Sequence, residues 1–88
     1  MENKFEALAN INISEGVVTQ NEMVQVINII KEETNTLEDL QNLRNSFVKW
    51  HSANRNTDEN SWDEAAYQNL SGVTAVIDHL MFRSGGLQ

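Results

Sequence analysis

The segment SANRNTDEN, residues 52–60, decides the fold because it separates two long stretches whose apolar residues recur at helical spacing. It is polar apart from Ala53 and rich in residues that favour turns. A polar connection this short predicts that the flanking helices lie antiparallel, as an αα-hairpin. The stretch before it carries apolar residues at steps of three, four and three, a coiled-coil-like seam. These residues are Leu40, Leu43, Phe47 and Trp50.

The stretch after the loop has its own start and stop signals. Ser61 with Glu64 fits a capping box, in which a hydroxyl and a carboxylate each accept a hydrogen bond from a backbone N–H of the first turn. Ser84-Gly85-Gly86 is typical of a helix end. We therefore predict helices over residues 37–52 and 61–83.

The helix over 61–83 has an apolar stripe that runs from Trp62 to Met81 and covers roughly 160° of its circumference. Tyr67 and Phe82 fall outside this stripe. Gly72 lies in the middle of the helix, where glycine costs about 1 kcal/mol relative to alanine. Close packing of another helix against Gly72 would explain its presence.

A third helix is predicted over residues 20–33, because Thr19 and Glu22 form another capping box pattern. Its apolar residues span about 220°, which is more than a one-sided surface helix needs. Thr34-Asn35-Thr36 interrupts the pattern, and either a kink or a very short turn would satisfy the sequence there.

Residues 1–18 complete the chain. Residues 2–9 fit a short helix, and residues 10–18 fit an extended connector that turns at Glu15-Gly16. A chain of 88 residues is too short for two cores, so residues 1–88 are predicted to form one domain. The expected fold is all-α: a small helical bundle built on an antiparallel αα-hairpin, with a third helix and a short N-terminal extension.

Composition narrows the function. There is no cysteine, which excludes disulfides and thiolate zinc sites and fits a reducing compartment, so we expect a cytoplasmic protein. The first ten residues lack the apolar core of a signal peptide, and no apolar run approaches the ~18 residues that span a membrane. Thirteen acidic residues against six basic ones give a net charge of −7. This charge disfavours direct binding of nucleic acid and makes basic protein surfaces the natural partners.

No motif indicates an enzyme, a metal site or a cofactor. Ser46 and His51 are five residues apart on one predicted helix, and His79 is expected at the far end of the hairpin from His51. The acid-rich stretch that starts at Asn54 resembles a calcium loop, but Glu59 and Ala65 stand where such a loop needs glycine and glutamate. We therefore expect no catalytic residues, no metal and no cofactor.

The wide apolar stripes indicate a binding surface, because large apolar surface on a small domain usually marks an interface. We expect a homo-oligomer and a protein partner, and a basic surface on that partner would complement the acidic charge of the chain. The candidate apolar interface residues are Met23, Val24, Ile27, Ile30, Trp50, Trp62, Tyr67, Val76 and Phe82. The candidate acidic interface residues are Glu32, Glu33, Asp58, Glu59, Asp63 and Glu64.

These features favour a non-enzymatic interaction protein that self-associates and binds or inhibits a larger protein. Small acidic proteins of this kind are typical of phages and mobile elements. Two alternatives remain open at this point. One is a binder of a small molecule or nucleotide signal, with sites between subunits where cations such as Lys4, Lys31, Arg44, Lys49 and Arg55 could meet the ligand. The other is an inhibitor whose paired acids mimic the charge of nucleic acid.

Overall fold

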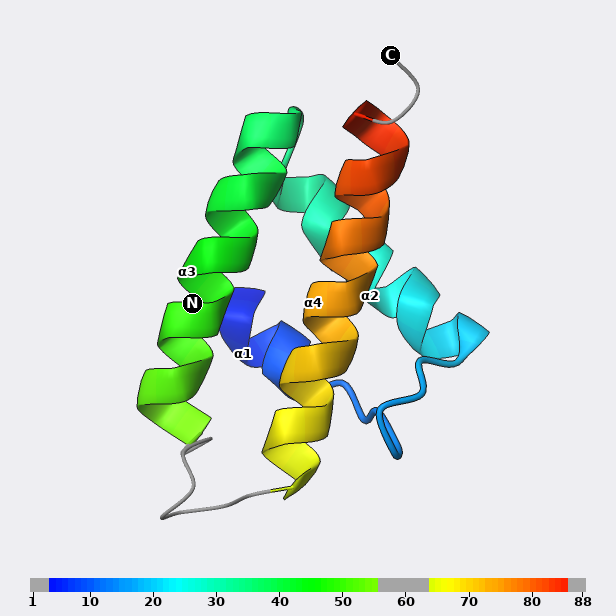
Figure 1. Cartoon of the computed structure of the whole chain (residues 1–88), viewed down its shortest axis with the longest axis vertical. Helices are drawn as coiled ribbons and strands as arrows, with labels where there is room; N and C mark the ends of the chain where they lie inside the picture. Colours follow the sequence, from blue (N-terminus) through cyan, green and yellow to red (C-terminus); the bar gives the residue numbers. More distant parts are fainter. Residues whose placement is uncertain (1–3, 56–63, 86–88) are drawn as a thin grey trace.

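The computed structural model describes residues 4–55 and 64–85, and in these residues the chain forms a small all-α bundle, as the sequence predicts (Figure 1). The helices are α1 (Lys4–Ala9), α2 (Gln20–Glu33), α3 (Leu37–Arg55) and α4 (Glu64–Gly85). In Figure 1 α3 and α4 lie side by side and run in opposite directions, with α2 crossing behind α4. Within the part of the chain that the structure describes, no helix has the length and apolar character needed to cross a membrane.

Helix α2 has a capping interaction at each end. The Thr19 hydroxyl accepts a hydrogen bond from the Glu22 N–H (3.3 Å), and the Glu22 carboxylate accepts one from the Thr19 N–H (3.1 Å). At the other end the backbone of Thr34 turns extended. Thr36 then caps α3 by accepting a hydrogen bond from the Asp39 N–H (3.1 Å). Each helix has its own cap, so residues 34–36 form a very short turn between two separate helices.

Helix α3 continues to Arg55, beyond the end near residue 52 that its composition suggests. The Asn54 side chain donates a hydrogen bond to the Trp50 carbonyl (2.8 Å), and the Arg55 guanidinium lies 2.9 Å from the Glu6 carboxylate on α1. These contacts satisfy polar groups of the last turn and compensate for its lack of apolar residues. The remainder of the predicted loop, and the Ser61 half of the predicted cap, lie outside the described residues.

The short helix α1 belongs to the core, although the sequence suggested only an extension. It packs against each of the other three helices, and its Leu8 is fully buried. Phe5 adds an aromatic cluster with two α3 side chains: its ring lies 6.2 Å from that of Phe47 and 6.0 Å from that of Trp50. The buried apolar core is Leu8, Ile11, Ile13, Val26, Ile30, Leu40, Leu43, Phe47, Val73, Val76 and Ile77.

The connector between α1 and α2 also contributes to this core, through Ile11 and Ile13. It turns at Glu15 and Gly16, which both have positive φ (55° and 71°). Gly16 adopts this conformation without a steric cost because it has no Cβ, whereas a positive φ is uncommon for a residue such as Glu15. The connector, and not another helix, explains Gly72. A Cβ atom at Gly72 would collide with the Ile13 side chain and would lie 3.2 Å from a methyl of Val18.

Candidate interaction surface

Two of the predicted apolar interface residues belong to the core of the chain. Ile30 is 2% exposed and Val76 is 3% exposed, so neither is available to a partner. Met23, Ile27 and Trp50 are partly buried and pack against the same core. The reason is that α1 and the connector cover apolar surface which the sequence left uncovered. The apolar excess that predicted an interface is therefore smaller than the helix patterns indicate.

Three predicted residues do lie on the surface. Phe82 is 75% exposed, Val24 is 49% exposed and Tyr67 is 46% exposed. Tyr67 and Phe82 share α4, in agreement with their position outside its apolar stripe, whereas Val24 is on α2. Trp62 lies outside the described residues.

Tyr67 and Phe82 mark the two ends of one surface, which we call the outer face of α4. They are fifteen positions apart, which corresponds to ~22 Å along a helix. At 100° per residue the members of this face fall within about 80° of the helix circumference. The outer face of α4 consists of Tyr67, Ser71, Ala75, Asp78 and Phe82.

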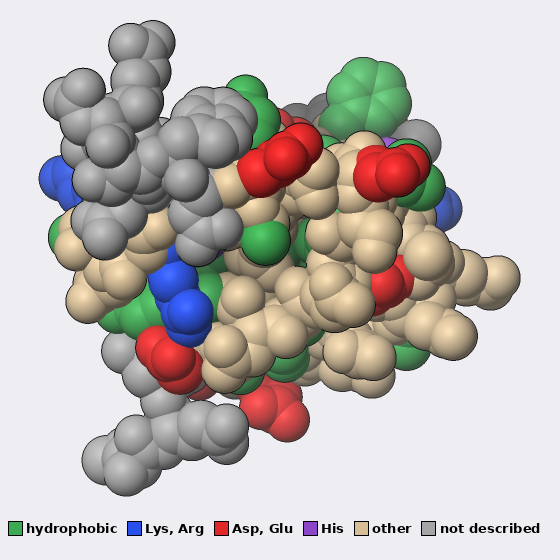
Figure 2. Space-filling view, turned by 90° about the horizontal axis from the view of Figure 1, so that it is seen from below, with side chains coloured by type: hydrophobic (Ala, Val, Ile, Leu, Met, Phe, Trp, Pro, Cys, Tyr) green, Lys and Arg blue, Asp and Glu red, His purple; other side chains and the backbone are tan. Residues whose placement is uncertain are grey.

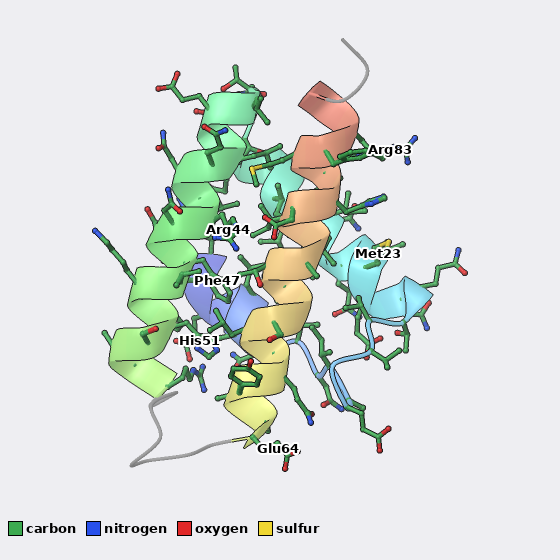
Figure 3. All side chains as sticks on the ribbon, viewed as in Figure 1. Met23, Arg44, Phe47, His51, Glu64 and Arg83 are labelled. Atoms are coloured by element: carbon green, nitrogen blue, oxygen red, sulfur yellow. The ribbon has the colours of Figure 1, made fainter. Side chains whose placement is uncertain are left out.

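Small side chains fill the middle of the outer face of α4, and its one acid forms an ion pair with a side chain of the neighbouring helix. Ala75 is exposed and Ser71 is half-buried. The Asp78 carboxylate accepts a hydrogen bond from the Arg44 guanidinium of α3 at 2.7 Å. In Figure 3 Arg44 projects from α3 toward α4, beside Phe47 and His51. The outer face of α4 therefore has aromatic rings at both ends, and small side chains and the Asp78–Arg44 ion pair lie between them.

Opposite charges lie at the two ends of α4. Glu64 is exposed in the first turn and Arg83 is exposed in the last turn, as Figure 3 shows. Glu64 accepts a hydrogen bond from the Gln68 side chain (3.4 Å). Among the described residues, neither Glu64 nor Arg83 forms an ion pair. Each charge also suits the dipole of its own helix end, which is sufficient to explain its presence.

The three predicted acidic residues that the structure describes do not form one surface. Glu32 and Glu33 are exposed at the end of α2, and Glu33 pairs with Lys4 at 3.4 Å. Glu64 lies at the opposite end of the bundle from them (Figure 1). Figure 2 shows acidic side chains scattered over the lower end of the molecule among uncharged ones. The other predicted acids, Asp58, Glu59 and Asp63, lie outside the described residues.

Asn69 is a structural residue that the sequence reasoning missed. It is 4% exposed, and its side-chain amide donates hydrogen bonds to the carbonyls of Leu8 (3.1 Å) and Ile11 (2.6 Å). These two bonds join the end of α1 and the connector to α4. The signal available in the sequence was an asparagine three residues after Ala66 and four before Val73, which places a polar side chain on the apolar stripe.

A hollow of about 260 Å³ lies beside Asn69, bordered by Asn10, His51, Arg55 and the connector. His51 is fully buried, with its ring edge-on to Phe47. His51 is buried on α3 whereas His79 is exposed on α4, so the structure does not bring the two histidines together. Ser46 is exposed on α3. Within residues 4–55 and 64–85 no three metal-ligating side chains converge.

Comparison with known proteins adds no relative. No family model matches the chain, and neither a curated protein nor a solved structure matches it. The candidate site therefore depends on the physical character of the outer face of α4.

Proposed function

We propose that this chain is a non-enzymatic interaction protein that self-associates through the outer face of α4 and binds or inhibits a larger protein. The observation that carries the proposal is the exposure of Phe82 and Tyr67 on one helix face. Aromatic side chains are enriched at the centres of protein interfaces, where they bury a large apolar area. The aromatic rings of Phe5, Phe47 and Trp50 pack against one another inside the same chain.

The charge of the chain suggests the kind of larger protein it would bind or inhibit. A net charge of −7 favours a partner with a basic surface and speeds its approach. The cysteine-free composition fits a reducing compartment such as the cytoplasm. A small acidic protein of this type, as is typical of phages and mobile elements, would act by occupying the basic surface of its partner.

A nucleotide-binding role has less support. Three of the cations that could meet a phosphate are already paired with carboxylates: Lys4 with Glu33, Arg44 with Asp78, and Arg55 with Glu6. These pairs are partly exposed, so each is weak. They nevertheless lower the positive charge available to an anionic ligand.

Native mass spectrometry of the purified protein tests the proposal. We expect an assembly heavier than the 10.0 kDa chain, and we expect Phe82→Glu to abolish it by placing a charge at the interface. Val24→Glu is the matched control, because Val24 is also exposed but lies on α2, and this variant should retain the assembly. Helical circular dichroism should be the same for all three proteins. A bare 10.0 kDa wild-type chain, or an assembly that survives Phe82→Glu, contradicts the proposal.

A further inference from the structure

We infer that a hollow beside the start of α4 binds an arginine side chain on the basic surface of the larger partner protein. This inference rests on the proposed function, since it specifies how that partner is recognised. The hollow has a volume of about 260 Å³ and lies between the connector turn and the first turns of α4. We call it the Glu15–Glu64 hollow, and it is lined by Glu15, Gly16, Glu64, Tyr67, Gln68 and Ser71.

The Gln68 side chain joins the two walls of the Glu15–Glu64 hollow. Its oxygen accepts a hydrogen bond from the Glu15 N–H (3.0 Å), and its amide nitrogen donates one to the Glu64 carboxylate (3.4 Å). These bonds tie the connector turn to α4 and hold the Glu64 carboxylate at the edge of the hollow. The walls are therefore in place before a ligand arrives, and binding does not have to order them first.

The charge of the Glu15–Glu64 hollow requires a cation from outside the chain. All six Lys and Arg residues lie within the part of the chain that the structure describes, and none of them forms an ion pair with Glu15 or Glu64. The helix dipole is sufficient to explain Glu64, but Glu15 is not at a helix end. Glu15 has φ of 55°, a conformation that glycine or asparagine adopts more readily, so the turn itself does not explain a glutamate there.

The aromatic wall of the Glu15–Glu64 hollow selects arginine among the cations. The Tyr67 side chain lines the hollow and is 46% exposed, and the face of an aromatic ring attracts a cation. A planar guanidinium can stack on such a ring while its N–H groups donate hydrogen bonds to carboxylates. A lysine ammonium is a compact, strongly hydrated charge that cannot make the same flat contact. The net charge of −7 also attracts the basic surface that carries the arginine.

The Glu15–Glu64 hollow shares only part of the outer face of α4. Tyr67 and Ser71 belong to both, whereas Phe82 lies fifteen residues further along the helix, ~22 Å away, and does not line the hollow. Arginine binding and self-association therefore compete at the Tyr67 end of the face. A substitution at Phe82 affects self-association alone, which allows the two proposals to be tested separately.

Titration of the full chain with Nα-acetyl-arginine amide, followed by NMR chemical shifts, tests the inference. We expect saturable shifts at the backbone amides of Gly16, Tyr67 and Gln68, with a dissociation constant of roughly 1–10 mM. Nα-acetyl-citrulline amide has nearly the same shape without the charge, and it should cause no saturable shift. Nα-acetyl-lysine amide should bind at least about threefold more weakly, because it lacks the planar guanidinium.

Substitution of the two carboxylates identifies the site. Glu15→Gln and Glu64→Gln each remove one charge at nearly constant size, and each should raise the dissociation constant of the arginine amide at least about threefold. Glu32→Gln is the matched control. It removes the same charge from an exposed acid on α2, outside the hollow, and should leave the dissociation constant unchanged. Circular dichroism should show the same helix content in all four proteins.

The outcomes separate this inference from the proposed self-association. Equal shifts with the citrulline amide, shifts centred on acids outside the hollow, or a dissociation constant that neither Glu15→Gln nor Glu64→Gln changes would each overturn the arginine site. If the assembly is nevertheless lost on Phe82→Glu, self-association through the outer face of α4 stands without it. If arginine binds as expected and the assembly survives Phe82→Glu, the hollow is supported and self-association through that face is wrong.

Discussion

The inner and outer faces of α4 differ in what the chain itself provides to cover them. On the inner face, Val73, Val76 and Ile77 are buried, Gly72 contacts the connector and Asn69 bonds to two backbone carbonyls. On the outer face two aromatic rings are exposed and the one acid pairs with Arg44. The comparison teaches that one helix can carry both the main stabilising contacts of a small bundle and its candidate binding surface, separated by half a turn.

The inner face should be the more sensitive to truncation. Ile77→Ala removes a fully buried side chain, and the resulting cavity should lower the free energy of unfolding by about 2–5 kcal/mol. Urea denaturation followed by circular dichroism measures this change. A loss below about 1 kcal/mol would mean that the inner face is packed far more loosely than the burial of Ile77 indicates.

Gly72 gives a smaller but sharper test of the inner face. Alanine favours a helix over glycine by about 1 kcal/mol, but here the added methyl meets the buried Ile13 side chain. We expect overpacking to outweigh the gain, so that Gly72→Ala lowers the free energy of unfolding by about 1–2 kcal/mol. Ile13→Val removes the methyl group nearest to the added Cβ. The double variant should therefore lose less free energy of unfolding than the sum of the two single variants, as measured in a double-mutant cycle by thermal denaturation. An additive result, or a stabilised Gly72→Ala protein, would argue that the connector can move away.

The fold could be predicted to the extent that it depends on local signals. The Thr19 and Glu22 cap and the apolar spacing of α4 are both contained in short stretches of sequence, and the structure has helices there. The role of α1 was not predictable in this way. Six residues are too few to show a period, and Leu8 is buried only because α2, α3 and α4 surround it.

The candidate surface could be predicted only in part, because exposure depends on which other elements of the chain cover a residue. Tyr67 and Phe82 lie outside the stripe of their own helix, and helix geometry alone indicated their exposure. The apolar spacing of a single helix predicted Ile30 and Val76 to be interface residues. That spacing does not show which other parts of the chain bury them. The partners of Asn69 are backbone carbonyls 61 and 58 residues away, which no local pattern contains.

Phe82 provides the smallest expected change in the stability of the single chain and the clearest contrast with Ile77. Because its ring is 75% exposed, Phe82→Ser should alter the free energy of unfolding by no more than about 0.5 kcal/mol in dilute solution. The two proteins should diverge as concentration rises. An assembled native state makes Tm increase with protein concentration, so wild type should show this increase and Phe82→Ser should not. Differential scanning calorimetry over a hundredfold range of concentration measures both quantities. If Phe82→Ser instead destabilises the dilute chain by more than about 2 kcal/mol, then Phe82 stabilises the fold of the single chain, and the contrast between the two faces of α4 is wrong.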